Sequence, residues 1–392
     1  MRVAYVNADP GVPVFGNKGC SVHLQEVLRA MVLTGYEVEL FTRRTGGVAP
    51  HDLSTVRVNP LTPLAQVEAG ARELAALDAN EELERLLALG AFNLVYERYS
   101  LWSYAGMEFA QRVGIPGILE VNAPLIEEHA AYRGLENRDR AEQVAKRVFS
   151  AAKVIVAVSS EVASYVSPFP QTAGKVAVVP NGINPDRFPE SVAPTLPSAA
   201  GVFTIGFVGS LKPWHGLDVL AQAFEEFHRQ QRESRLIIVG DGPERPKFEN
   251  HFSASGLANN VVFTAAVLPA EVPGLLASMD VAVAPYPKLE PFYFSPLKVY
   301  EYMAAGLPVV ASRIGQIAEM VDHQLTGWLT PPGDPGALVE AFRTLRALPE
   351  LRKRMGQAAR ARVLKNHTWT QSIRRIFDLA FAQPPLPHAV TN

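Results

Sequence analysis

The sequence predicts an α/β protein built from two doubly wound parallel-sheet domains. The first observation is a repeated alternation of short apolar runs with amphipathic helical stretches along most of the chain. The second is an interruption of that alternation over 184–201, where "NPDRFPESVAPTLPSAAG" is rich in Pro, Ser and Ala. Alternating strands and helices are typical of parallel sheets covered on both faces, so the interruption divides one such domain from the next.

The first 188 residues are predicted to form the N-terminal domain. A strand over 3–6, an amphipathic helix over 21–33 that stops at Gly35, and a strand over 37–42 make a β-α-β unit. Further apolar runs predict strands over 92–100, 115–121, 153–160 and 175–183.

The alternation restarts after the interruption and predicts a C-terminal domain over 189–367. An amphipathic helix over 217–230 follows the first of its strands. The predicted strands cover 204–210, 235–242, 261–266, 280–286 and 308–312. From about Pro335 the pattern is helical, and the tail over 382–392 is expected to fray.

Composition indicates a globular protein of a reducing compartment. Of the 392 residues 48% are hydrophobic and 19% charged, and the net charge of -2 gives no general reason to bind nucleic acid, whose phosphates call for a basic face. The single cysteine, Cys20, cannot form an intrachain disulfide. No apolar run approaches the roughly 20 residues of a membrane helix, and the first residues lack a signal-peptide core. We expect a cytoplasmic protein, with a peripheral contact to the inner face of the membrane left open.

The segment "SPLKVYEYMAAG" at 295–306 places a lysine where a helix is least suited to one. Ser295 reads as the N-cap and Pro296 as the first helical residue, so Lys298 lies in the first turn. The helix dipole is positive at this end and backbone N–H groups lack partners there, so a cation needs a neighbouring anion. The free N–H groups of Leu297 and Lys298 are suited to hold a phosphate.

Glu301 lies on the same face of this helix, one turn or about 5 Å beyond Lys298. That step suits the distance from a diphosphate to a ribose, whose hydroxyls an acidic residue can bind. The alternative is a solvated surface pair of Lys298 and Glu301 on a capped helix. This segment alone does not decide between the two readings.

Other glycine-rich loops follow predicted strands, where ligands of open α/β sheets bind. "FVGSLKPWHG" offers Gly209 and Lys212 to a phosphate, with a tight turn and an exposed lysine as the alternative. "VFGNKGCSVH" contains Lys18 and Gly19 but lacks the G-x-G-x-x-G spacing of a dinucleotide site. "IVGDGPERPK" adds Gly240.

Metal and nucleophile patterns are missing from the sequence. No His or Cys residues stand at ligand spacing, and no paired acidic motif lies between strands, so we expect a reaction without metal or resident cofactor. Cys20 and His23 read as a small hydrophobe and a partly buried histidine, because no triad partner accompanies them.

Several stretches together resemble one known family. "SPLKVYEYMAAGLPVVAS", "VGSLKPWHG", "VVPNGINPDRF", "IVGDGPER" and "LTGWLTPPGDPGAL" are similar to the retaining nucleotide-sugar glycosyltransferases of family 4. The similarity covers nearly the whole chain and is strongest over about 175–370. It implies the GT-B fold, in which two Rossmann-like domains face each other across a cleft, with the acceptor on the N-terminal domain and the donor on the C-terminal one. It also implies that a C-terminal helix, about 368–392, packs back on the N-terminal domain.

The resemblance also assigns site residues by position. In this family the glutamate at the position of Glu301 holds the donor ribose, and the helix N-terminus holds the diphosphate. Lys298 and Lys212 would stabilise the leaving diphosphate, and Asn122 would lie at the acceptor. The implied donor-binding residues are Lys18, Gly19, Gly209, His215, Gly240, Ala266, Val267, Tyr293, Ser295, Pro296, Leu297 and Glu301.

Some positions depart from the family pattern. Many members carry a second glutamate that touches the donor sugar, where this chain has Tyr293, and Glu290 is the candidate to replace it as a catalytic group. The usual lysine before the loop glycine is His215 here, which leaves Lys212 to carry the phosphate charge. A histidine that often follows the strand at 115–121 is Asn122 here.

The implied reaction is a retaining transfer of a sugar from a nucleotide-diphosphate sugar to an acceptor hydroxyl. Lys298, Lys212 and the helix N–H groups would bind the departing charge more strongly in the transition state than in the ground state. The sugar, the base and the acceptor, whether a glycan, a lipid-linked molecule or a small molecule, stay open. The alternatives are a GT-B hydrolase, phosphorylase or epimerase, a nicotinamide-dependent oxidoreductase, and a non-catalytic nucleotide-binding protein.

Overall fold

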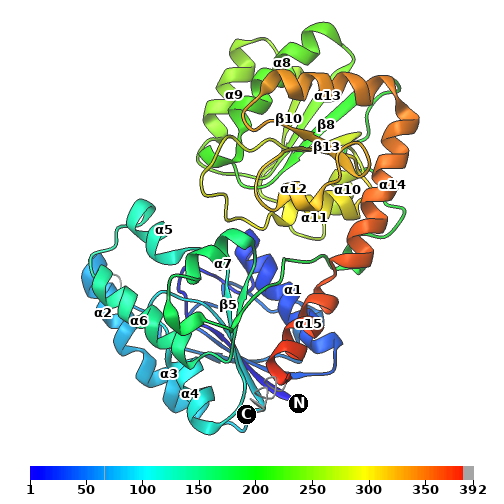
Figure 1. Ribbon diagram of the computed structural model, residues 1–392. Helices are drawn as coiled ribbons and strands as arrows, with labels where there is room; N and C mark the ends of the chain where they lie inside the picture. Colours follow the sequence, from blue (N-terminus) through cyan, green and yellow to red (C-terminus); the bar gives the residue numbers. More distant parts are fainter. Residues whose placement is uncertain (66, 383–392) are drawn as a thin grey trace, which may run out of the picture.

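The computed structural model describes residues 1–65 and 67–382, so the tail that we expected to fray lies almost wholly outside the described residues. Two α/β domains lie end to end, and the chain passes between them twice (Figure 1). Each domain holds one sheet whose recorded strand pairs are all parallel. The predicted pair of doubly wound domains is confirmed.

The sheet of the N-terminal domain has seven strands in the order β3-β2-β1-β4-β5-β6-β7. They are β1 (Arg2–Asn7), β2 (Glu37–Thr42), β3 (Arg57–Pro60), β4 (Leu94–Arg98), β5 (Gly117–Val121), β6 (Val154–Ala157) and β7 (Val176–Val178). Its helices are α1 (Gly19–Leu33), α2 (Ala69–Asp78), α3 (Asn80–Leu87), α4 (Ala105–Val113), α5 (Leu125–Tyr132), α6 (Arg138–Ala151) and α7 (Ser160–Val166). The strand order reverses between β1 and β4, which marks the crevice where such sheets bind ligands.

The sheet of the C-terminal domain has six strands in the order β10-β9-β8-β11-β12-β13. They are β8 (Phe203–Val208), β9 (Ser234–Val239), β10 (Val261–Phe263), β11 (Val281–Ala284), β12 (Val309–Ser312) and β13 (Gly327–Thr330). Its helices are α8 (Leu217–Gln230), α9 (Arg245–Ala254), α10 (Val272–Leu276), α11 (Leu297–Ala304), α12 (Ile317–Met320), α13 (Pro335–Ala347) and α14 (Pro349–Asn366). The order reverses between β8 and β11.

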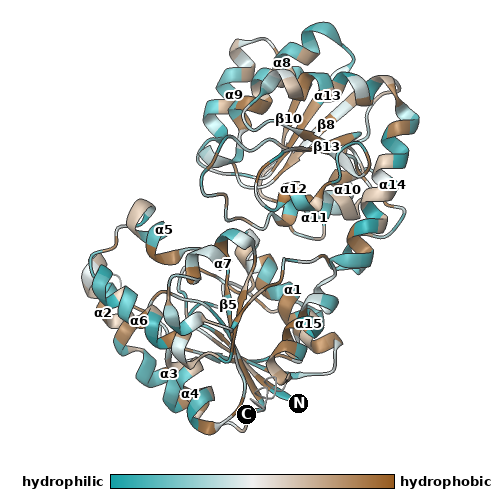
Figure 2. Ribbon diagram, in the orientation of Figure 1, coloured by the Kyte–Doolittle hydropathy of each residue, from teal (hydrophilic) through white to brown (hydrophobic). Residues whose placement is uncertain are grey.

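Apolar strands form the interior of both domains, while the helices turn hydrophilic faces outward (Figure 2). Each sheet is buried on both faces, and each face packs in its own apolar cluster. In the N-terminal sheet the rings of Tyr5 and Tyr96 stack with centroids 5.2 Å apart between neighbouring strands. Burial on both faces explains why these strands read as continuous apolar runs.

The two crossings between the domains lie against each other. Ile183 and Thr368 form a parallel bridge, and the Ile183 carbonyl accepts from the backbone N–H of Trp369 at 3.1 Å. A side chain at Gly182 would place its Cβ 2.6 Å from the Trp369 nitrogen, so only glycine fits this approach. The last helix, α15 (Trp369–Phe381), then packs beside α1 in the N-terminal core (Figure 1).

The start of α11 differs from the prediction. Its first helical residue is Leu297, because Pro296 is extended, with ψ of 103°, and occupies the N-cap position. Ser295 is therefore not the N-cap. The predicted stop is confirmed, since Gly306 follows the helix with a φ of +72°.

Candidate active site at the domain junction

The N-terminus of α11 is held against the N-terminal domain. Asn181, just before the first crossing, donates through Nδ2 to the Ser295 carbonyl at 2.9 Å, and its backbone N–H donates to Ser295 Oγ at 3.3 Å. Leu297 packs against the apolar cluster that contains α1. The first turn of this helix therefore lies where the two domains meet.

Lys298 carries a buried ammonium group without a partner. Its Nζ has no hydrogen bond to any described residue and lies 4.1 Å from the ring centroid of Phe207 and 5.4 Å from that of Tyr286. Burial lowers the pKa of this lysine to about 7, although the neighbouring Glu301 acts to raise it. An unpaired polar group in such a place costs about 1–3 kcal/mol, and more for a charge, so the site calls for an anion.

The glycine loops after β8 and β9 lie next to Lys298. A Cβ added at Gly209 would sit 2.8 Å from the lysine Nζ, and Gly209 has a φ of +148°. A Cβ at Gly240 would sit 2.2 Å from the Gly209 carbonyl oxygen. These two predicted residues are therefore packed together beside Lys298 at the carboxyl ends of their strands.

His215 and Lys212 come from the loop before α8. His215 Nδ1 lies 2.5 Å from the Ser210 carbonyl, and burial, then Lys298, lowers the pKa of this histidine to about 3. It is therefore neutral at pH 7 and supplies no charge to a phosphate. Lys212 Nζ lies 5.7 Å from the ring centroid of Trp214. Lys212 and Lys298 are thus the cations of this loop and helix.

Glu301 is ion-paired and only 13% exposed, so the reading of Lys298 and Glu301 as a solvated surface pair is wrong. Its Oε1 accepts from Arg187 Nη2 at 3.4 Å, and Arg187 Nη1 donates to Glu26 of α1 at 3.4 Å. Burial raises the pKa of Glu301; Arg187 opposes this rise and Glu26 adds to it. Arg187 was not among the residues predicted for the site, although it lies in the stretch "VVPNGINPDRF" that carries the family resemblance.

Tyr293 and Glu290 lie differently in the loop before α11. Tyr293 spans the junction, since its hydroxyl donates to Glu128 Oε2 of α5 at 3.2 Å and its carbonyl accepts from Ser159 Oγ at 3.0 Å. Glu290 is exposed and pairs with Lys288 at 3.5 Å. Among the described residues Glu290 pairs only with Lys288, so its role as a replacement for the missing family glutamate stays a prediction.

Asn122 follows β5, but its side chain turns toward the sheet. Its Nδ2 donates to Glu120 Oε2 at 3.1 Å, and His23 Nε2 lies 3.0 Å from the same oxygen. Burial acts to raise the pKa of Glu120, but His23, with Arg98 and Asn122, outweighs it and holds this pKa at about 2. One N–H of the Asn122 amide is thus bonded to Glu120, and a contact between Asn122 and the acceptor stays a prediction.

The remaining predicted donor residues lie at the start of α1 and just beyond the end of β10. Lys18 is the N-cap of α1 and Gly19 its first residue, and both are exposed. Ala266 is exposed beyond the end of β10, and Val267 packs against the C-terminal core.

The described residues, 1–65 and 67–382, show neither a metal-binding cluster nor a membrane-spanning helix. They contain no group of at least three His, Cys, Asp or Glu side chains placed to hold a metal ion. They also contain no helix that is both long and apolar enough to cross a membrane.

Family models match most of the chain. Residues 17–187 match the model described as Glycosyltransferase Family 4, and residues 202–347 match Glycosyl transferases group 1. A D-inositol 3-phosphate glycosyltransferase of Streptomyces scabiei is 28% identical over an alignment of 378 residues, which covers 88% of this chain and 82% of that protein. The enzyme of the same name from Pseudarthrobacter chlorophenolicus is 26% identical over 381 residues, with 90% and 88% covered.

Solved structures share the fold over nearly the full length. A sucrose-phosphate synthase from Thermosynechococcus elongatus superposes with a TM-score of 0.75 at 21% identity, covering 97% of this chain and 98% of that one. HepE of Anabaena, in complex with UDP and glucose, gives a TM-score of 0.73 at 19% identity, with 96% and 98% covered. The predicted GT-B architecture is confirmed.

Proposed function

The chain belongs to the glycosyltransferases of family 4, and we propose that it transfers a sugar, with retention, from a nucleotide-diphosphate sugar to an acceptor hydroxyl. The observation that carries this proposal is the buried ammonium of Lys298, which has no partner among the described residues and lies in the first turn of α11. A diphosphate is the anion that would pair with it.

Leaving-group stabilisation would come from the start of α11. The N–H groups of Leu297 and Lys298 are at the positive end of the helix dipole, and the ammonium of Lys298 lies on the same turn. When the bond from the anomeric carbon to the diphosphate breaks, negative charge grows on the phosphate oxygens. These groups, with Lys212 of the neighbouring loop, then bind more strongly than in the ground state, which lowers the barrier without a metal ion.

The rest of the donor would lie along the junction. Glu301 would accept hydrogen bonds from the ribose, and Gly209 and Gly240 would let the donor approach the backbone closely. Lys18 and Gly19 would close over the phosphates. Ala266 and Val267 would contact the base. The site around the sugar would be shaped by His215, Tyr293, Ser295 and Pro296.

Retention would follow from attack on the face that the leaving group vacates. The bond from the anomeric carbon to the diphosphate oxygen breaks, a bond to the acceptor oxygen forms, and the acceptor proton passes to a phosphate oxygen. Tyr293 replaces the family's second glutamate, and its hydroxyl donates to Glu128, so no carboxylate stands at that position. This scheme needs no protein base.

The comparisons suggest which substrates to test first. The complex of HepE with UDP and glucose supports a uridine nucleotide as the first donor. The names of the curated relatives support D-inositol 3-phosphate as the first acceptor, ahead of glycans and lipid-linked molecules.

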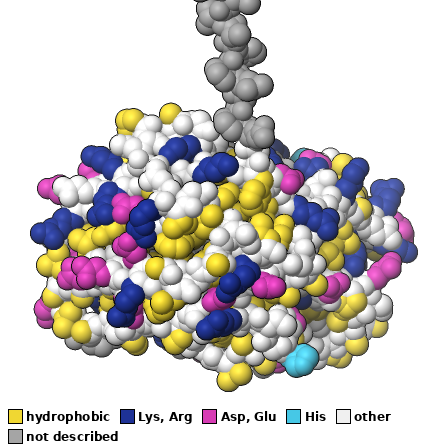
Figure 3. Space-filling view, turned by 90° about the horizontal axis from the view of Figure 1, so that it is seen from below, with side chains coloured by type: hydrophobic (Ala, Val, Ile, Leu, Met, Phe, Trp, Pro, Cys, Tyr) yellow, Lys and Arg dark blue, Asp and Glu magenta, His cyan; other side chains and the backbone are white. Residues whose placement is uncertain are grey.

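We also propose action in the cytoplasm, because one cysteine in 392 residues suits a reducing compartment. Peripheral membrane contact would need a cationic face. Figure 3 shows Lys and Arg side chains interspersed with Asp and Glu on one face of the N-terminal domain, so this face offers no field of one sign.

Thermal unfolding against UDP, GDP, ADP, TDP and NAD tests the proposal. A ligand at about 100 times its dissociation constant adds about 2.7 kcal/mol, so one nucleoside diphosphate should raise the midpoint clearly. Glu301→Ala and Lys298→Ala should lose this shift, whereas Glu340→Ala, an exposed residue of α13, should keep it. If NAD alone raises the midpoint, or if none of the nucleotides raises it, the proposal is overturned.

A further inference from the structure

A hydrogen bond between Tyr293 and Glu128 joins the two domains. Tyr293 lies in the loop between β11 and α11 of the C-terminal domain, and Glu128 lies on α5 of the N-terminal domain. The Tyr293 hydroxyl donates to Glu128 Oε2 at 3.2 Å, and among the described residues this hydroxyl has no other hydrogen bond. Both side chains are partly exposed, so a ligand at the junction can reach them.

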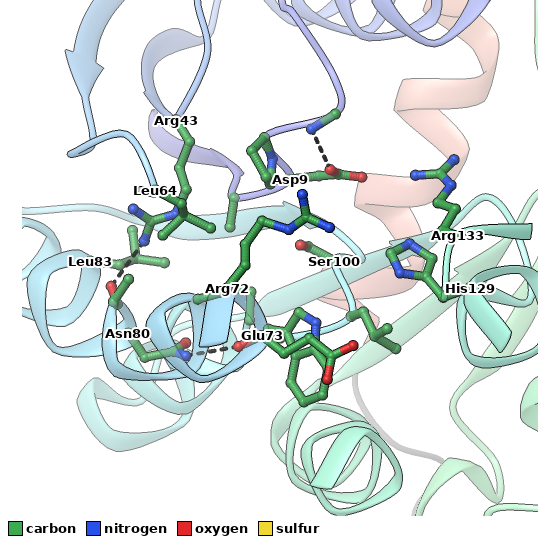
Figure 4. Close-up of a pocket in the computed structure, with 18 of the residues that line it drawn as sticks. Asp9, Arg43, Leu64, Arg72, Glu73, Asn80, Leu83, Ser100, His129 and Arg133 are labelled. Carbon is green, nitrogen blue, oxygen red and sulfur yellow. Dashed lines mark hydrogen bonds between the residues drawn. The ribbon is translucent and has the colours of Figure 1, made fainter. Parts of the chain in front are cut away.

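The carboxylate of Glu128 is oriented by Arg133, which follows the last residue of α5. Glu128 Oε1 accepts from Arg133 Nη2 at 2.7 Å. The other terminal nitrogen of Arg133 lies near the loop after β1, since a Cβ added at Gly11 would sit 3.7 Å from it. Figure 4 shows this guanidinium turned toward Asp9 of that loop, with His129 on the same helix. Oε1 is thus bonded within the N-terminal domain, and Oε2 is left for Tyr293.

The direction of this hydrogen bond determines what Tyr293 can offer to a ligand. An ionised carboxylate has no hydrogen to donate, so the single hydrogen of the phenol is used in the bond to Glu128. Burial, and then Glu128, raises the pKa of the Tyr293 phenol, so the hydrogen stays on its oxygen. The remaining lone pairs of that oxygen can only accept. Tyr293 therefore offers a ligand an acceptor and no donor.

The Tyr293 oxygen belongs to the part of the junction that adjoins the proposed diphosphate site. Tyr293 precedes Lys298 by five positions and packs against the apolar cluster of the N-terminal domain. Trp214, in the loop before α8, has its ring 6.3 Å from that of Tyr132, which lies one helical turn beyond Glu128. The loops before α8 and α11 therefore both reach α5. A sugar linked to a diphosphate at the start of α11 would lie between these loops and α5.

We propose that Tyr293, oriented by Glu128, recognises the donor sugar by accepting a hydrogen bond from one of its hydroxyl groups. This inference rests on the proposed function and adds a specificity-determining residue to it. Glu128 is a positioning residue, because it acts on the sugar only through Tyr293. A donor sugar without a hydroxyl at that point would leave the phenol oxygen without a partner, so the protein would discriminate against it.

Calorimetric titration of the full chain with fluorinated donors tests the inference. The first probe is the nucleoside diphosphate, among UDP, GDP, ADP and TDP, that raises the unfolding midpoint. The others are its glucose conjugate and the four conjugates in which fluorine replaces the sugar hydroxyl at C2, C3, C4 or C6. Fluorine is similar in size to a hydroxyl group but cannot donate a hydrogen bond. The ratio of the two affinities therefore measures the hydrogen bond that the sugar donates.

The variants are Tyr293→Phe and Glu128→Ala. The matched control is Glu127→Ala, which removes the neighbouring carboxylate of α5. The side chain of Glu127 is 57% exposed and pairs with Arg138 rather than with Tyr293.

In the wild type we expect fluorine at one sugar position to weaken binding about tenfold, as for one lost hydrogen bond. In Tyr293→Phe this penalty should fall to about twofold or less, because the ring offers no acceptor. It should also fall at least about threefold in Glu128→Ala, because the released hydroxyl can rotate and donate. Glu127→Ala should keep the penalty of the wild type.

A purely structural bond between Tyr293 and Glu128 would give a different result. Its loss would weaken fluorinated and unmodified donors alike and leave their ratio unchanged. The inference is therefore overturned if the wild type shows no penalty at any sugar position, or if the penalty persists in Tyr293→Phe. It is also overturned if Glu127→Ala removes the penalty as fully as Glu128→Ala.

Titration of the nucleoside diphosphate without a sugar separates the two proposals. Tyr293→Phe and Glu128→Ala should still bind it, which also shows that both variants are folded. If it binds and the fluorine penalty is the same in Tyr293→Phe as in the wild type, the proposed function stands and this inference is wrong. If no nucleoside diphosphate binds the wild type, the proposed function is wrong, and so is the inference that rests on it.

Discussion

Arg187 donates to Glu301 at 3.4 Å and thereby ties the glutamate proposed to hold the ribose to the segment between the domains. The same guanidinium donates to Glu26 of α1 at 3.4 Å, and the side chains of Glu301 and Glu26 are only 13% and 3% exposed. Two carboxylates in such a place repel each other unless a cation lies between them. Arg187 therefore favours the ionised form of Glu301, which is the form that accepts hydrogen bonds from a ribose.

Replacing Arg187 should weaken donor binding in a pH-dependent way. In Arg187→Gln, burial and Glu26 would raise the pKa of Glu301 further, because only Lys298 would still oppose them, so more of its carboxyl group would be protonated. We expect nucleoside diphosphate affinity to fall about tenfold at pH 6, equal to about 1.4 kcal/mol, and to recover as pH rises. Calorimetric titrations from pH 6 to pH 8 measure this.

Arg187→Lys keeps the cation and should recover most of the affinity at pH 6. Arg229→Gln on the exposed end of α8 is the matched control and should bind like the wild type. A pH-independent loss in Arg187→Gln would instead indicate a purely structural role for Arg187.

Lys298→Met should stabilise the ligand-free protein while it removes activity. The substitution takes away a buried ammonium that has no partner among the described residues, which should raise the free energy of unfolding by about 1–3 kcal/mol at pH 6. In the folded protein the pKa of Lys298, about 7, lies below the ordinary lysine value of 10.5. Between these values the unfolded chain binds the extra proton, so wild-type stability rises with pH and the advantage of the variant should shrink.

Denaturant unfolding of the wild type and Lys298→Met at pH 6 and pH 9 measures this difference in stability, and kcat is measured for both proteins. We expect kcat to fall by about a hundredfold or more, because charge on the leaving group loses its main partner. A variant that is less stable than wild type at pH 6 would mean that the ammonium already has a partner in the ligand-free protein.

Nucleoside diphosphate binding at pH 8 should take up close to one proton. With a pKa of about 7, Lys298 is mostly neutral at that pH, and a diphosphate beside it would raise the pKa well above 8. Calorimetry in buffers with different ionisation enthalpies measures the uptake. Lys298→Arg, which stays charged, should bind with no such uptake. Equal uptake in both proteins would place the proton on another group.

Much of the fold could be predicted because most strands are buried on both faces. The helix over 217–230 and the strand over 37–42 were predicted with the bounds that the structure has. Two strands were missed, and both are at sheet edges. In β3, "RVNP" has only exposed or half-exposed side chains, and β13 begins at a glycine within a turn-rich stretch. Without an apolar run, neither strand has a periodic signal.

The site was predictable only where local chain geometry determines it. Neighbouring residues in the sequence place Lys298 in the first turn of a helix and Gly209 after a strand. The pairing of Arg187 with Glu301 joins positions 114 residues apart, and Arg187 lies in a segment without periodicity. Side-chain pairs of this kind depend on the tertiary fold.

Tyr293 occupies the position of the missing family glutamate, and Glu290 is the candidate to replace that glutamate. We expect a substitution at Tyr293 to lower kcat/KM and one at Glu290 to leave it almost unchanged. Tyr293→Phe removes the hydrogen bond to Glu128 across the junction, so we expect kcat/KM to fall about three- to tenfold, consistent with about 0.5–1.5 kcal/mol for one hydrogen bond. Glu290 and its partner Lys288 are both 78% exposed, so Glu290→Gln should change kcat/KM by less than about twofold. Steady-state kinetics of both variants, with one donor and acceptor pair, show which of the two residues contributes to the reaction. A loss of a hundredfold in Glu290→Gln, with Tyr293→Phe unchanged, would show that Glu290 moves into the site when the donor binds and takes the role of the missing glutamate.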